Sequence, residues 1–161
     1  MSNIEEKLQI ERISVRRWRV SASLWLPHSR EHIFDFFARA ENLNLITPPW
    51  VHFQIKTPLP VAMDKGVHID YTIRLHGIPV AWKTEITTWE PSRRFIDEQL
   101  NGPYRVWIHE HTFEAVDGGT LCRDQVDYEP PGGAIINRWF VQPDVFKIFS
   151  YRHHKMKELF A

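Results

Sequence analysis

The chain has 161 residues, of which 43% are hydrophobic and 25% charged, and this length suits a single domain with one core. Its 20 Lys and Arg residues balance 20 Asp and Glu residues, so its overall field does not favour nucleic acid as a partner. No apolar run approaches the roughly 20 residues of a membrane helix, and the acidic opening lacks the apolar stretch of a secretory peptide. We therefore expect a soluble, cytoplasmic protein with no membrane insertion.

The first residues mix charges with isolated apolar side chains at no clear period. This pattern predicts a loosely ordered arm or a short amphipathic helix over residues 1–16, followed by one domain over residues 17–161. Cys122 is the one cysteine of the chain, so it forms no internal disulfide, and no matching ligand spacing indicates structural zinc. Its expected role is packing.

A strand and two short helices are expected next. Residues 17–26 alternate apolar and polar side chains, which is typical of a half-buried strand, and Pro27 ends it. Ser29 is placed to cap a helix whose apolar residues recur at helical spacing. A second helix, at about residues 42–46, ends before Pro48. Both helices therefore lie between the first two predicted strands.

The segment 67–76 predicts the next strand of the sheet, because apolar and polar side chains alternate along it. Gly77 and Ile78 fit a two-residue hairpin turn with Gly at the first central position. This turn would set Tyr71 opposite Thr84.

A second hairpin turn is predicted at residues 91–92, and it would set Ile86 opposite Asp97. The connection at residues 101–104 would then hold an odd number of residues, in a bulged loop, so that His109 lies beside Asp97. This register is the one on which the site prediction depends most.

A third tight turn is predicted at residues 118–119, which are both glycine. It would pair His111 with Val126 and His109 with Tyr128. The three turns agree on one inner face of the sheet, and that face is unusually polar. Its polar and aromatic residues are Asp97, Gln99, Trp107, His109, His111, Asp124 and Tyr128. We interpret this face as the lining of a ligand cavity.

The C-terminal part predicts a long helix. Residues 130–133, Pro-Pro-Gly-Gly, end the sheet, and Pro143 suits the first position of the helix. One stripe of this helix must be buried, and it comprises Val145, Ile148, Phe149, Arg152, Met156, Leu159 and Phe160. The predicted fold is therefore α+β: a helix-grip, in which a curved antiparallel sheet of six to seven strands wraps around the helix.

Several stretches resemble a known family: LPHSREHIFDFFARAENLNLITPPW, GIPVAWKTEITTWEPSRRFIDEQLNGPYRVWIHEHTFE, GTLCRDQVDYEPPGG and IFSYRHHKMKELF. They are similar to the START-like ligand-binding superfamily, also called SRPBCC, which includes polyketide cyclases and dehydrases and lipid-transfer domains. The resemblance covers nearly everything after Arg17. It implies a cavity between sheet and helix that holds an apolar or aromatic molecule, and it implies no shared catalytic residue.

Three interpretations of the His109-Glu110-His111 pair stay open. With Asp97 as a third ligand, the two imidazoles could bind Zn or Fe. Both rings could instead be hydrogen-bonded in a polar network of the core. In the third interpretation, Asp97 holds one nitrogen of His109 and raises its pKa, the other nitrogen moves a proton, and Tyr128 polarises a carbonyl.

The remaining candidates are expected to contact a ligand. They are Tyr71, Trp82, Thr84, Gln99, Trp107, His111, Asp124, Phe149 and Arg152. For Asp124 we favour the alternative of an ordinary carboxylate near a turn. Arg152 either reaches into the cavity for an anionic group or extends to the rim, and we favour the rim. Since neither a G-x-G-x-x-G nor a Walker pattern is present, we predict no cofactor, and we assign no metal.

We predict that the protein binds a small hydrophobic or aromatic molecule. The first alternative is an enzyme of the cyclase or dehydrase kind that uses His109 and Asp97, with Tyr128 assisting. The second is a protein-interaction module with a vestigial cavity. The first two need an enclosed volume of roughly a few hundred Å³, and a helix packed flush on Trp107 and His109 would favour the third.

Overall fold

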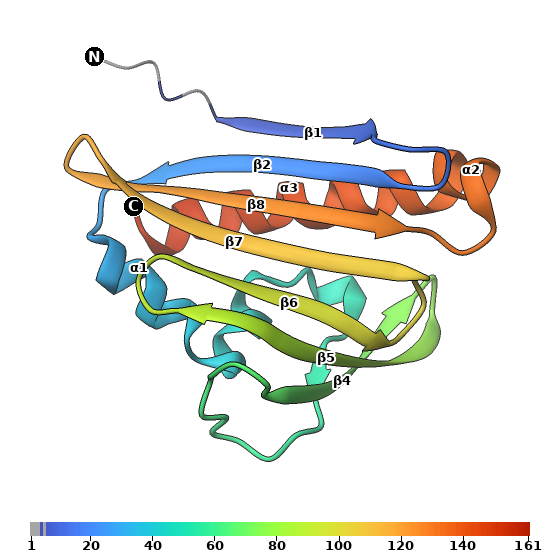
Figure 1. Ribbon diagram of the computed structural model, residues 1–161, viewed down its shortest axis with the longest axis horizontal. Coiled ribbons are helices and arrows are strands. Elements are labelled where there is room, and N and C mark those ends of the chain that lie inside the picture. Colours follow the sequence, from blue (N-terminus) through green and yellow to red (C-terminus); the bar gives the residue numbers. More distant parts are fainter. Residues whose placement is uncertain (1–3, 5) are drawn as a thin grey trace.

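The computed structural model describes residue 4 and residues 6–161. One antiparallel sheet of eight strands has the order β1-β2-β8-β7-β6-β5-β4-β3 (Figure 1). The strands are β1 (Lys7–Arg12), β2 (Trp18–Leu26), β3 (Gln54–Ile55), β4 (His68–Leu75), β5 (Ile78–Glu90), β6 (Arg94–Asn101), β7 (Val106–Val116) and β8 (Gly119–Glu129). The helices are α1 (Arg30–Phe37), η1 (Ala40–Ile46), η2 (Pro49–Val51), α2 (Gly133–Ile136), η3 (Asn137–Val141) and α3 (Gln142–Leu159).

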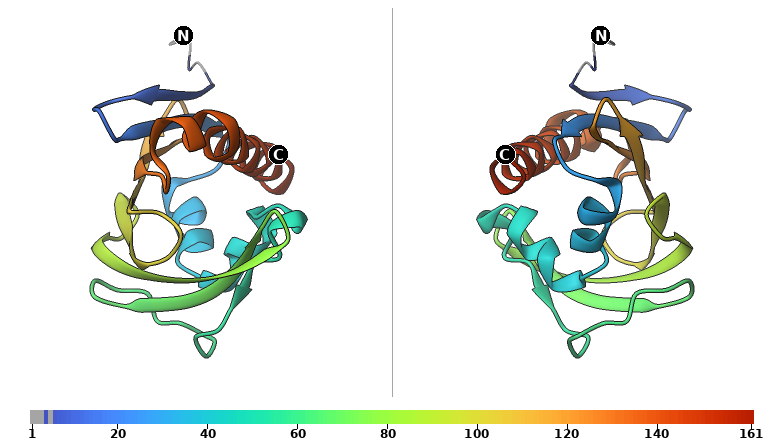
Figure 2. Two further views of the ribbon diagram at one scale, coloured as in Figure 1. Left: turned by 90° about the vertical axis from the view of Figure 1, so that its right-hand side faces the viewer. Right: turned by 90° about the vertical axis from the view of Figure 1, so that its left-hand side faces the viewer.

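The sheet curves around the space that α3 covers, and the short helices between β2 and β3 lie at its open side (Figure 2). This arrangement confirms the predicted α+β helix-grip fold. The strand number is higher than the six to seven expected. None of the helices among the described residues is both long and apolar enough to cross a membrane.

The extra strand comes from the N-terminal segment, for which the prediction of a loose arm or a helix is wrong. Residues Lys7–Arg12 pair with β2 along their whole length. Leu8 and Ile10 pack against the cluster around Trp18. β1 lies at the edge of the sheet and is held mainly by backbone pairing with β2. Its alternation of apolar and polar side chains is therefore too short to predict a strand. Residues 1–3 and 5 of the predicted arm lie outside the described residues.

Local sequence signals explain the next elements. Every second residue of β2 is buried, as the alternation predicts. The side chain of Ser29 accepts a hydrogen bond from the backbone N–H of His32 and so caps α1. Helix α1 then buries Ile33, Phe34 and Phe37 on one side. These residues close the end of the core nearest the C-terminus of α3.

The β4–β5 hairpin has a register different from the predicted one. His76 and Gly77, with φ of 51° and 78°, are the central residues of the turn. Positive φ at both positions is typical of a type I′ turn, whose twist suits a hairpin. Tyr71 therefore lies opposite Trp82 and not opposite Thr84. Since the shift is two residues, the inner face of the sheet is unchanged.

The β7–β8 hairpin differs from its prediction in the same way. Its turn is centred on Asp117 and Gly118, with φ of 50° and 77°. His111 is therefore opposite Asp124, and His109 is opposite Val126. Tyr128, predicted to face His109, pairs with Trp107.

The predicted pairing of β6 with its two neighbours is confirmed. Ile86 lies opposite Asp97, and Asp97 lies opposite His109. The β5–β6 turn is one residue longer than predicted, because Glu90 pairs with Arg94. A bulge between Ile86 and the next paired residue compensates for the longer turn. The inner position of Asp97 is thus kept.

The C-terminal helix packs lengthwise against the concave face of the sheet (Figure 1). Pro143 lies in its first turn, as predicted. Val145 and Phe149 contact the cluster around Val126, and Met156 contacts the cluster that includes α1. The predicted stripe is thus mostly buried, whereas Leu159 is exposed.

Candidate functional site

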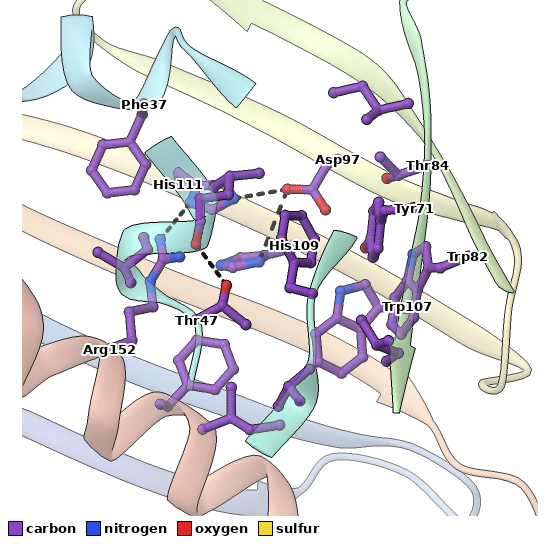
Figure 3. Close-up of a pocket in the computed structure, with 18 of the residues that line it drawn as sticks. Phe37, Thr47, Tyr71, Trp82, Thr84, Asp97, Trp107, His109, His111 and Arg152 are labelled. Carbon is purple, nitrogen blue, oxygen red and sulfur yellow. Dashed lines mark hydrogen bonds and ion pairs between the residues drawn. The ribbon is translucent and has the colours of Figure 1, made fainter. Parts of the chain in front are cut away.

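A cavity of about 190 Å³ lies between the sheet and α3. Apolar residues from α1, η1, η2 and the strands β4 to β7 form most of its wall. Four charged or titratable residues lie at one end, and aromatic residues lie at the other (Figure 3). The charged end comprises Asp97, His109, His111 and Arg152, and the aromatic end comprises Tyr71, Trp82, Tyr104 and Trp107.

The aromatic end follows from the observed register. Tyr71 stacks on Trp82, with ring centroids 5.7 Å apart and an angle of 17°. Trp107 meets Trp82 edge to face at 5.4 Å, and Tyr104 packs on Trp107 at 4.6 Å. The indole Nε1 of Trp82 is buried and has no hydrogen-bond acceptor among the described residues. A buried donor without an acceptor is uncommon in folded proteins and costs stability.

Gln99 is not part of the cavity wall, although we predicted that it contacts a ligand. Its amide donates to the carbonyl of Tyr104 at 2.7 Å and accepts from the N–H of Tyr104 at 3.2 Å. Gln99 therefore fixes the loop that carries Tyr104 into the cavity. Thr84 does line the cavity, and its hydroxyl donates to the backbone carbonyl of Glu98.

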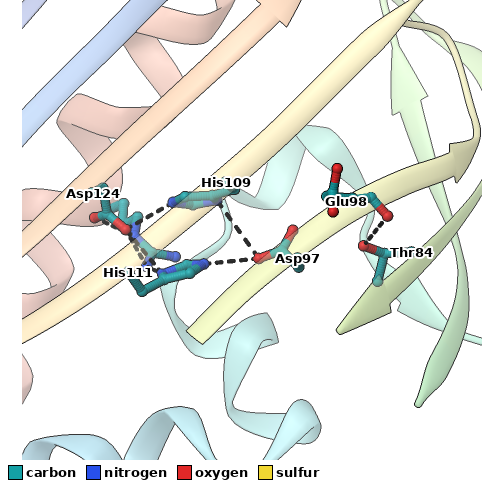
Figure 4. Close-up of polar contacts among 7 residues, drawn as sticks. Thr84, Asp97, Glu98, His109, His111 and Asp124 are labelled. Atoms are coloured by element: carbon teal, nitrogen blue, oxygen red, sulfur yellow. Dashed lines mark hydrogen bonds and ion pairs between the residues drawn. The ribbon is translucent and has the colours of Figure 1, made fainter. Parts of the chain in front are cut away.

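Asp124 is not part of the cavity wall, although we predicted that it contacts a ligand, and it instead joins three residues of the charged end from behind (Figure 4). It accepts a hydrogen bond from Nε2 of His109 at 2.8 Å and lies 3.0 Å from Nδ1 of His111. The guanidinium of Arg152 reaches the same carboxylate through Nε at 3.2 Å and Nη2 at 3.1 Å. Asp124 is thus a buried charge partner of three side chains, and the alternative of an ordinary carboxylate near a turn is wrong.

Asp97 holds a different histidine from the one predicted. Its Oδ2 accepts from Nε2 of His111 at 2.8 Å, whereas Nδ1 of His109 is 3.9 Å away. Each imidazole therefore has its own close carboxylate, Asp97 for His111 and Asp124 for His109. His111 additionally contacts Asp124, so carboxylate oxygens lie near both of its nitrogens.

The two imidazoles differ in their protonation. Burial lowers the pKa of His109, and the neighbouring His111 lowers it further. Burial alone would also lower the pKa of His111, but the hydrogen bonds to Asp124 and Asp97 outweigh it, and this pKa is raised. The rings stack with centroids 3.7 Å apart, so two adjacent positive charges would be costly. Of the two imidazoles, His111 therefore binds a proton more readily than His109.

Both carboxylates are ionised at neutral pH. Burial alone would raise the pKa of Asp97, but the hydrogen bond from His111 and nearby positive charge lower it. The pKa of Asp124 is well below its usual range, because Arg152 and the two histidines offset the effect of burial. Two negative charges thus face the guanidinium of Arg152 and the imidazole of His111, whose Nδ1 lies 3.3 Å from Nη2 of Arg152. The charges of the cluster balance when His111 is protonated.

Arg152 points into the protein, so our preference for the rim is wrong. The residue is 9% exposed and lines the cavity. Its guanidinium lies 5.2 Å from the centroid of the Phe37 ring, a cation–π distance. The buried carboxylate of Asp124 explains why an arginine occupies the apolar stripe of α3.

Tyr128 lies away from His109. Its hydroxyl donates to Oδ1 of the buried Asn137 at 2.9 Å. It faces Trp107 across the strands and is not part of the cavity wall. Its predicted assistance at His109 therefore has no geometric support.

The ring nitrogens of His109 and His111 and a carboxylate oxygen of Asp97 lie within 4.8 Å of one another, close enough to consider a metal ion. A metal binds an imidazole in the plane of the ring, where the nitrogen lone pair lies. The two rings are stacked with an angle of 27° between their planes, so their lone pairs do not converge on one point. Nε2 of His111 is also bonded to Asp97. These contacts fit a hydrogen-bonded cluster better than a set of metal ligands.

Several cavity residues were not among the predicted site residues. They include Phe37, Ile46, Val51, Met63 and Tyr104. Phe37 ends the apolar stripe of α1, which marks it as buried but not as part of a cavity. Tyr104 lies in the loop before β7, where no periodicity indicates its direction.

The sequence profile of the family described as "Polyketide cyclase / dehydrase and lipid transport" matches residues 26–144. The chain belongs to this family. The match confirms the resemblance to START-like, or SRPBCC, proteins. A search of curated proteins found no match.

Solved structures of other family-like proteins share the fold. Protein Ms6760 from Mycobacterium smegmatis is 16% identical, with a TM-score of 0.67 over 95% of this chain and 97% of that one. CV1439 from Chromobacterium violaceum is 11% identical, with a TM-score of 0.68 over 88% and 96%. Major latex-like protein 151 from Panax ginseng is 9% identical, with a TM-score of 0.67 over 90% and 98%. At these identities the similarity concerns the fold alone.

Proposed function

We propose that this protein binds one small apolar or aromatic molecule between the sheet and α3. The observation that carries the proposal is a largely apolar cavity with a cluster of paired charged side chains at one end. A buried charge cluster costs desolvation free energy and is weak evidence for stability. Its position on a cavity wall is better explained by contact with a ligand.

The size of the cavity limits the ligand. Pockets for drug-sized molecules usually measure about 300–1,000 Å³, while a dry cavity of about 150 Å³ holds benzene. A cavity of about 190 Å³ therefore suits a molecule of one or two rings. The volume is smaller than the few hundred Å³ expected for a binding protein or an enzyme, and the ring centroid of Phe149 on α3 lies 5.7 Å from that of His109, so the interaction module with a vestigial cavity stays an alternative.

A cavity-filling substitution tests the binding site. Ile69 is buried on the cavity wall, so Ile69→Phe should reduce the affinity for naphthalene about tenfold or more by occupying the ligand's space. Tryptophan fluorescence would report binding, since Trp82 and Trp107 line the cavity. Ile96→Phe makes the same change on the outer face of β6 and should bind as the wild type does. Equal affinity in both variants would contradict this site.

The second candidate function is an enzyme of the cyclase or dehydrase kind. One observation favours it: His109 donates from Nε2 to Asp124, and its Nδ1 on the cavity wall makes no hydrogen bond. A neutral imidazole held in this tautomer can accept a proton from a bound molecule. Asp124, not Asp97, orients the ring.

Proton exchange tests this candidate. If His109 is a base, the protein should accelerate exchange of the α-hydrogens of 1-indanone in deuterated water, as measured by NMR. His109→Gln should lower that rate about a hundredfold or more. His154→Gln, on the exposed side of α3, is the control and should keep the full rate. Exchange no faster than in buffer would count against acid–base catalysis on ketones.

A further inference from the structure

The cavity wall offers hydrogen-bond acceptors that the protein does not use. Asp97 contacts His111 and His109 through the same oxygen, Oδ2. Its other oxygen, Oδ1, is therefore left for a ligand. His109 uses Nε2 for Asp124, and its Nδ1 is 3.9 Å from the nearest carboxylate oxygen. Both residues line the cavity. This end of the wall therefore favours a ligand that donates a hydrogen bond.

The positive charges of the cluster are already compensated inside it. Arg152 directs Nε and Nη2 to Asp124, and both nitrogens of His111 face carboxylates. An anionic ligand would bring a further negative charge close to Asp97 in a buried site. A cationic ligand would bring a positive charge next to His111. In a low-dielectric cavity either charge costs far more than in water.

The other end of the cavity is aromatic. The indole nitrogen of Trp82 is buried and has no acceptor among the described residues. The flat faces of Tyr71 and Trp107 beside it suit an aromatic ring.

We propose that the cavity selects neutral molecules of one or two rings that carry a hydroxyl group, which donates to Asp97 or His109, and that it discriminates against aromatic carboxylates and amines. The proposal rests on the binding function proposed above and specifies its ligand class. It assigns Asp97 and His109 as specificity-determining residues. Arg152, which we considered as an anchor for an anion, instead neutralises Asp124.

A set of matched naphthalene derivatives tests the ligand class on the wild-type protein. Isothermal titration calorimetry at pH 7 would compare naphthalene, 2-naphthol, 2-methoxynaphthalene, 2-naphthoate and 2-naphthylmethylammonium. 2-Naphthol should bind about tenfold more tightly than its methyl ether, which keeps the oxygen but lacks the donor. The carboxylate and the ammonium compound should bind more weakly than naphthalene itself.

A variant of Asp97 tests whether this residue causes the preference for the hydroxyl group. Asp97→Asn keeps the shape of the side chain but replaces one acceptor oxygen with an N–H donor group, so it should remove most of the preference for 2-naphthol over its methyl ether. Asp70→Asn makes the same change outside the cavity wall and should keep the preference. Circular dichroism would confirm that both variants are folded. If Asp97→Asn does not fold, His109→Gln tests the same wall.

The outcomes separate this proposal from the proposed function. If none of the five compounds binds, the binding function itself fails for molecules of this size. If naphthalene or the methyl ether binds as tightly as 2-naphthol, binding stands and the hydroxyl preference is overturned. If 2-naphthoate or the ammonium compound binds best, the charge-balance argument is overturned. A preference for 2-naphthol that persists in a folded Asp97→Asn variant and in His109→Gln would place the recognition elsewhere.

Discussion

Asp124→Ala is expected to lower the free energy of unfolding by about 3–5 kcal/mol at neutral pH, because it leaves the buried guanidinium of Arg152 without its carboxylate and removes one of the two carboxylates beside His111. The carboxylate compensates Arg152 and His111 and also holds His109. A buried charge network adds little net stability, but removal of one partner leaves a buried charge uncompensated and therefore costs much more. Urea denaturation followed by tryptophan fluorescence would measure the change.

The matched control is Asp127→Ala on the same strand. Asp127 accepts from Arg19 at 2.6 and 2.8 Å on the outer face of the sheet, with both side chains partly exposed. Such a surface ion pair contributes about 1 kcal/mol or less. If Asp124→Ala were no more destabilising than this control, the cluster would not be the buried charge network described here.

The stability of the protein is expected to fall on both sides of a maximum near pH 6.5, the ordinary pKa of histidine. Below it, His109 and the two carboxylates destabilise the fold. The folded pKa of His109 is lowered, so its contribution is lost as the pH falls from 6.5 through that pKa. The pKa values of Asp97 and Asp124 are lowered from 3.8, so their contributions are lost at still lower pH.

Above pH 6.5, stability falls as the pH rises, because of His111. The folded pKa of His111 is raised above 6.5, so its stabilising contribution is complete below pH 6.5 and is lost as the pH rises through the folded pKa. Thermal unfolding between pH 4 and pH 9 would record both sides. His111→Gln should remove the alkaline loss caused by this group, whereas His154→Gln, an exposed residue, should keep it. An unchanged alkaline side in His111→Gln would show that His111 is not the charged imidazole.

The inner face of the sheet was predictable because it depends on a period of two residues. Both hairpin registers were wrong by two residues, and a shift of two keeps every side chain on its face. The same shift changes the partner across the strands. The prediction placed Val126 opposite His111, so Asp124 was not expected beside His111 and the network around it was not foreseen.

The error has one cause in both hairpins. A glycine at the first central position of the turn was taken as the signal, but the first central residues are His76 and Asp117 in left-handed conformations. Non-glycine residues adopt positive φ in type I′ turns when the twist of the strands favours it. A prediction from sequence uses the φ preference of each residue and does not include the twist of the strands.

The sequence by itself determined the order of elements from β2 onward, the polar inner face and the buried stripe of α3, because each follows from a local period or a capping residue such as Ser29. Only the tertiary structure decided that Asp124 joins Arg152 to both histidines, and that Asp97 holds His111. These contacts join β6, β7, β8 and α3, which are distant in sequence, and their geometry depends on turn conformation and helix packing. The pKa shifts in the cluster depend in turn on those distances and on burial, and neither can be read from any single segment of the sequence.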